Sequence, residues 1–80
     1  MGIDFTIRGK PMHLTKEQVI ELLKGVEPSS IQAHMVEIEG VQFPVKKAFA
    51  HVTGLDLLEF QTAEARRVFE RLGFKVSRRK

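Results

Sequence analysis

The sequence predicts a single small α+β domain in which a small antiparallel or mixed sheet is covered on one face by helices. The chain has 80 residues, which is too short for two independent cores. Some segments alternate apolar and polar residues, as strands do, and others repeat apolar residues with the helical period. The expected order is β-α-β-β-α-α-β, with one domain over residues 1–76 and a basic C-terminal tail at 77–80.

Composition supports a folded core and excludes several classes of site. Hydrophobic residues make up 42% of the chain and include six Phe, which argues against disorder. There is no Cys, so disulfides, thiolate nucleophiles and Cys-based metal sites are excluded. No apolar run approaches the ~20 residues that span a bilayer, and residues 1–10 contain no signal-peptide core. We therefore expect a cytoplasmic protein with no membrane partner.

The N-terminal third of the chain predicts a strand and then a helix. Residues 4–8 alternate apolar and polar side chains, as in a half-buried strand, and a turn is expected at 9–11. Thr15 is a good N-cap, and Gln18 stands three residues later to complete a capping box. Gly25 can adopt the left-handed conformation that ends a helix.

The middle of the chain predicts a β-hairpin. Residues 35–38 and 41–43 alternate on either side of Glu39-Gly40. Glu-Gly is a poorer two-residue turn than Asn-Gly, so a longer loop is an open alternative.

The C-terminal half predicts two helices and a closing strand. Pro44 suits the first position of a helix, and Gly54 can end it. A short helical turn is expected next, and then a third helix capped by Thr62. Gly73 followed by apolar Phe74 predicts a Schellman ending, ahead of a strand at 74–76.

Charge is distributed unevenly along the chain. Residues 1–65 contain six Lys/Arg and nine Asp/Glu, which gives a net charge of −3. Residues 66–80 contain seven Lys/Arg and one Glu, which gives a net charge of +6. Such asymmetry favours a polyanion or an acidic protein surface as partner. A solubilising tail without a partner is the alternative.

The basic residues are the main functional candidates. Arg67 and Arg71 are four apart and share the outer face of the third predicted helix. If this helix packs beside the second, its cations would join those of the second helix and of the C-terminal end in one patch for phosphates, with salt-sensitive and mostly sequence-independent affinity. The predicted nucleic-acid-binding residues are Lys46, Lys47, Arg67, Arg71, Lys75, Arg78, Arg79 and Lys80. DNA is the favoured partner, with RNA as the alternative.

Enzyme activity has no support in the sequence. His13, His34 and His51 do not show the spacing of a metal site, and the glycines stand singly rather than in a phosphate-binding loop. No catalytic residue, metal, cofactor or small-molecule substrate is therefore expected.

Two other binding roles remain open. Ala50, Gly54 and Phe60 have the small-residue, glycine and apolar spacing of a helix-turn-helix, but Asp56 and Glu59 would place negative charge where its second helix enters the groove. A chain of this size buries only roughly 60% of its unfolded surface, so a protein–protein adaptor or a small homodimer is the alternative function.

A sequence pattern in the second half of the chain resembles a known family. The residues that carry it are 36–47, 53–55, Phe60 and 71–76. They resemble a small bacterial domain with the pattern G-x-x-[YF]-P-x-K … G … F … L-G-F, which is associated with short uncharacterised proteins and with N-terminal modules of modification-dependent (type IV) restriction nucleases. The resemblance implies a DNA-associated accessory module without catalytic activity. Lys46 is the one matching polar position, and Phe43 stands where the family often has Tyr.

Overall fold

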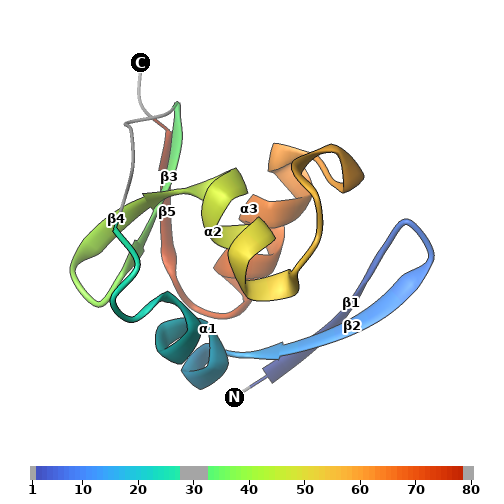
Figure 1. Cartoon of the computed structure of the whole chain (residues 1–80), viewed down its shortest axis with the longest axis horizontal. Helices are drawn as coiled ribbons and strands as arrows, with labels where there is room; N and C mark the ends of the chain where they lie inside the picture. Colours follow the sequence, from blue (N-terminus) through green and yellow to red (C-terminus); the bar gives the residue numbers. More distant parts are fainter. Residues whose placement is uncertain (1, 28–32, 79–80) are drawn as a thin grey trace.

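The computed structural model describes residues 2–27 and 33–78, and its elements place helices between two small sheets (Figure 1). The elements are, in chain order, β1 (Gly2–Ile7), β2 (Lys10–Thr15), α1 (Lys16–Leu23), β3 (His34–Ile38), β4 (Val41–Pro44), α2 (Val45–Thr53), the 3-10 turn η1 (Leu57–Glu59), α3 (Thr62–Arg71) and β5 (Lys75–Arg78). Strands and helices alternate irregularly and both sheets are antiparallel, so the predicted α+β class is confirmed.

The larger sheet has the order β4-β3-β5, with β3 in the centre. Val36 on β3 lies opposite Phe43 on β4 and Val76 on β5. Paired residues of antiparallel strands point to the same side of the sheet, and Val36 is fully buried and belongs to the core. This register therefore defines the face that α2 and α3 cover.

Phenylalanine rings connect the two sheets through the helices. The ring of Phe49 on α2 lies 5.8 Å from that of Phe5 on β1, 4.7 Å from that of Phe60 and 5.9 Å from that of Phe69 on α3, measured between ring centroids. Phe69 in turn contacts Phe74 edge-on at 6.1 Å. Five of the six Phe are buried, and four of these, Phe49, Phe60, Phe69 and Phe74, belong to this aromatic cluster.

The helix and turn signals of the sequence are largely confirmed. Thr15 and Gln18 form the capping box, with hydrogen bonds of 3.0 and 2.9 Å between side chain and backbone. At the end of α3, Phe74 N–H donates to Phe69 C=O and Gly73 N–H donates to Glu70 C=O, which is the Schellman pattern.

The hairpin turn at Glu39-Gly40 has only two residues. Ile38 and Val41 are paired directly, and both turn residues have positive φ, 51° and 78°. Two positive φ values are what a type I′ turn requires, so the longer loop held open for this sequence does not form.

One strand was missed, and with it the second sheet. The predicted order lacks β2, which pairs with β1 from Gly2↔Thr15 to Ile7↔Lys10. Pro11 suggested a turn, but a proline is compatible with an edge strand, and both strands of a two-stranded sheet are edges. The turn is instead Arg8-Gly9, whose φ values are 50° and 81°. The helices are therefore covered on both sides rather than lying on one sheet.

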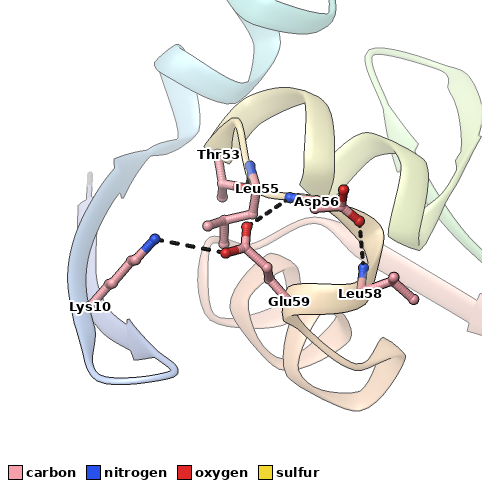
Figure 2. Close-up of polar contacts among 6 residues, drawn as sticks. All are labelled: Lys10, Thr53, Leu55, Asp56, Leu58 and Glu59. Carbon is pink, nitrogen blue, oxygen red and sulfur yellow. Dashed lines mark hydrogen bonds and ion pairs between the residues drawn. The ribbon is translucent and has the colours of Figure 1, made fainter.

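The connection between α2 and α3 is held by its own polar groups (Figure 2). Asp56 accepts a hydrogen bond from Leu58 N–H, and Glu59 accepts one from Asp56 N–H, both at 2.9 Å. The connection spans residues 54–61 and contains η1, so it lacks the roughly three- to four-residue turn of a helix-turn-helix.

Several element boundaries differ from the predicted ones. Pro44 is the N-cap of α2 and the last residue of β4 rather than the first residue of the helix. The N-cap of α3 is Gln61 rather than Thr62, because Glu64 accepts a hydrogen bond from Gln61 N–H at 2.9 Å. At the other end of the chain, β5 continues through Arg78, which pairs with His34, so two residues assigned to the tail belong to the sheet. Arg79 and Lys80 lie outside the described residues.

Among residues 2–27 and 33–78, no helix combines the length and the apolar character needed to cross a membrane.

Candidate functional site

A cavity of about 660 Å³ opens at one end of the molecule, where four segments meet. They are the start of β3, the first turn of α2, the turn η1 and the first residue of α3. The lining residues are Ala33, His34, Pro44, Val45, Lys46, Lys47, Leu57 and Thr62. The cavity therefore combines apolar walls with two ammonium groups, an imidazole and a hydroxyl, and none of these eight residues is acidic.

The first turn of α2 supplies both lysines. Pro44 is the N-cap residue and no side chain caps this helix, and its first turn contains no acidic residue. The start of a helix carries a partial positive charge from its unpaired N–H groups, and Lys46 and Lys47 add two full charges there. Lys46 Nζ lies 5.5 Å from the centroid of the Phe60 ring, a cation–π contact that fixes its direction. Lys47 is exposed.

The sheet places a third cation next to the cavity residue His34. Arg78, the last residue of β5, is paired with His34, the first residue of β3, so both lie at the cavity end of the sheet. His34 is half-buried and Arg78 is exposed.

Two buried nitrogen atoms of the described residues lack hydrogen-bond partners, and one of them belongs to the cavity residue His34. In the described part of the chain, Nδ1 of His34 and Nε of Arg66 are buried and accept or donate no hydrogen bond. Arg66 lies one turn after Thr62 on the same face of α3. At least about 90% of buried polar groups are hydrogen-bonded, so these two nitrogens are exceptions within the described residues.

The fold places the predicted nucleic-acid-binding residues in separate parts of the molecule. Lys46 and Lys47 line the cavity, and Arg78 lies at the same end of the larger sheet as His34. Arg71 ends α3, roughly 13 Å along the helix from Thr62, and Lys75 begins β5 directly after the following turn, so both lie towards the opposite end. Arg67 lies between the two groups, and the predicted Arg79 and Lys80 fall outside the described residues.

The six described cations of the predicted set are free of ion pairs. Over residues 2–27 and 33–78, the ion pairs are Lys10 with Glu59 at 3.7 Å and His13 with Asp4 at 2.7 Å. No neighbouring carboxylate therefore neutralises the two lysines or Arg78. The nearby acid Glu64 instead accepts the N–H of Gln61.

The three histidines make different contacts. His13 contacts Asp4 across the hairpin, and Nε2 of His51 donates to the C=O of Leu22 at 2.9 Å, which joins α2 to the end of α1. His34 alone borders the cavity. Nowhere in the described segments do three His, Asp or Glu side chains gather in a way that could hold a metal ion.

Lys46 and Lys47 are the only predicted site residues among the eight that line the cavity, and the other six include His34, Leu57 and Thr62. His34 was one of three scattered histidines, Thr62 resembled a helix cap, and Leu57 belonged to a connection. No local pattern distinguishes them, because their proximity arises only when β3, η1 and α3 pack around the start of α2.

These observations define a small α+β domain with a cation-rimmed cavity at one end. A family comparison adds the chain's relationship: the model of the SCO5918-like family matches residues 5–80, so the chain belongs to that family. The comparison with curated proteins finds no match, and neither does the comparison with solved structures.

Proposed function

We propose that this protein is a non-catalytic nucleic-acid-binding module, with DNA as its partner, that contacts phosphates at the cavity end. The observation that carries the proposal is the pair of lysines, Lys46 and Lys47, at the uncapped start of α2. Arg78 is paired with the cavity residue His34, and none of these three cations is in an ion pair. Lysine, arginine and helix N-termini are the groups that most often contact nucleic-acid phosphates.

The remaining sequence features are consistent with this role. The net charge of +6 over residues 66–80 would add long-range attraction for a polyanion. The resemblance to N-terminal modules of type IV restriction nucleases points towards DNA rather than RNA. The cavity residues include no acidic side chain to pair with His34 as acid and base, which favours binding over catalysis.

Fluorescence anisotropy with a short DNA duplex at two salt concentrations tests the proposal. The wild-type protein should bind at low salt and weaken as salt increases, because binding releases counterions. The double variant Lys47→Ala/Arg78→Ala should weaken binding to all sequences alike and lower the salt slope by about one for each phosphate contact removed. Lys46 is left in place, since its contact with Phe60 also serves packing.

A matched control removes the same charge elsewhere. Arg71→Ala/Lys75→Ala deletes two exposed cations from the opposite end and should change affinity much less. Equal losses in both double variants would show diffuse attraction rather than an interface at the cavity. An absence of binding at low salt, or binding indifferent to salt, would overturn the proposal.

A protein partner is a second candidate, favoured by one observation. Leu58 in η1 is 87% exposed and its neighbour Leu57 is 47% exposed. Adjacent exposed leucines on a hydrogen-bonded turn can insert into an apolar pocket of a partner or a second copy. Light scattering over a range of concentrations would detect self-association, and Leu58→Ser should abolish it; a concentration-independent monomer would exclude the homodimer.

A further inference from the structure

The cavity has a second property that phosphate attraction does not require, namely its apolar interior. Phosphates on a duplex can be bound by an exposed convex surface, yet here Val45, Pro44 and Leu57 line a hollow behind the lysines. A volume of about 660 Å³ falls within the range of roughly 300–1,000 Å³ that is typical of small-molecule sites. The occupant must therefore offer a flat or compact apolar part next to a negative charge.

The polar groups in the cavity further restrict which ligand it can bind. His34 contributes an imidazole ring to the cavity lining, and Thr62 contributes a hydroxyl. Imidazole rings stack on bases, and the edges of unpaired bases carry both donors and acceptors. Lys46 and Lys47 lie on the α2 side of the same cavity, where they can neutralise a phosphate.

We propose that the cavity binds one unpaired nucleotide, with its base against His34 and the apolar wall and its phosphate at the first turn of α2. This inference rests on the proposed function and specifies it: the interface would prefer single strands, ends or bulged positions over a continuous duplex. A base buried in a duplex cannot reach the cavity without leaving the stack, which costs a few kcal/mol.

Nuclear magnetic resonance titrations with small probes test the cavity directly. Adenosine monophosphate should shift the amide signals of His34, Lys47 and Thr62. Inorganic phosphate should shift only the signals of the α2 turn, and adenosine alone should produce weaker shifts than the monophosphate. Equal effects of phosphate and adenosine monophosphate would contradict a base site.

Anisotropy with a duplex, and with the same duplex carrying one unpaired nucleotide, tests the preference. The wild-type protein should bind the bulged DNA about tenfold more tightly, given that stacking of one base contributes about 1–3 kcal/mol. His34→Ala and Leu57→Ala should remove most of this preference while leaving duplex binding at low salt intact. Leu22→Ala is the matched control, because Leu22 is 46% exposed, like Leu57 at 47%, but lies on α1 away from the cavity.

The outcomes separate the two proposals. Failure to bind either DNA would overturn the nucleic-acid role itself. Salt-sensitive binding of both DNAs with equal affinity, and no adenosine monophosphate shifts at the cavity, would overturn only the nucleotide site. A loss of preference in Leu22→Ala as large as that in Leu57→Ala would also count against the site, since it would reflect stability rather than contact.

Discussion

At the residue scale, the two hairpin turns place side chains where glycine or asparagine is normally preferred. Arg8 and Glu39 both have φ near 50°, a conformation that costs an L-residue roughly 1–2 kcal/mol relative to the right-handed region. Asn tolerates it better because its short polar side chain bonds to the local backbone. Both turns are formed nevertheless, since the ladders on either side fix the register.

Replacing Glu39 with Asn should therefore stabilise the protein. We expect the free energy of unfolding to increase by about 0.5–1 kcal/mol, measured by urea denaturation, because Asn-Gly is a preferred type I′ pair. Glu37→Asn is the control: it removes the same charge from the same hairpin, but at a strand position where Asn is disfavoured, and should bring no gain. A gain in both variants would point to charge rather than turn conformation.

At the scale of the element, η1 shows how local hydrogen bonds position the cavity wall (Figure 2). Asp56→Ala removes the acceptor for Leu58 N–H and should lower the free energy of unfolding by about 0.5–2 kcal/mol, as loss of a cap does. Lys10→Ala removes the 3.7 Å ion pair between Lys10 and Glu59. Because the Lys10 side chain is exposed, this change should lower the free energy of unfolding by at most about 1 kcal/mol. Chemical denaturation of both variants compares these two losses of unfolding free energy. A larger loss in Lys10→Ala than in Asp56→Ala would mean that the contact with the β1–β2 hairpin, and not the cap, holds η1 in place.

Helices whose ends contain capping residues can be predicted from the sequence, whereas a strand without a local turn or pairing signal cannot. The capping box at Thr15 and the Schellman ending at Gly73 determine helix ends from nearby residues alone. By contrast, β2 contains a proline and flanks a turn with Arg rather than Asn, so neither local signal favoured it. Its pairing with β1 depends on packing against Phe49, which is contributed by a distant helix.

For the whole molecule, the basic residues can be predicted from the sequence, but the cavity cannot. Charge is additive along the chain, so the sequence is enough to identify the cations, including Lys46 and Lys47 in the first turn of α2. The cavity depends on where long-range contacts place β3, η1 and α3, and it includes Lys46 and Lys47, while Arg71 and Lys75 lie towards the other end. Composition therefore predicts a class of partner, whereas only the fold predicts where that partner would bind.

The β1–β2 hairpin is the part of the molecule that depends most on others for stability. A two-stranded sheet is at best marginally stable alone. This one contacts the core through the buried Ile7 and Leu14 and through Phe5, whose ring packs on Phe49. Phe5→Ala should lower the free energy of unfolding by about 2 kcal/mol, less than the 3–5 of a fully buried Phe, because Phe5 is only half-buried.

Native-state hydrogen exchange then tells whether the hairpin opens by itself. In Phe5→Ala, amides of β1 and β2 should lose protection well before those of β3, because the β4-β3-β5 sheet keeps its own contacts with α2 and α3. Val76→Ala, which trims a half-buried side chain of that sheet, should not selectively expose the hairpin. If Phe5→Ala instead lowers protection equally in all strands, the two sheets unfold as one unit and the hairpin is an integral part of the core, despite having only two strands.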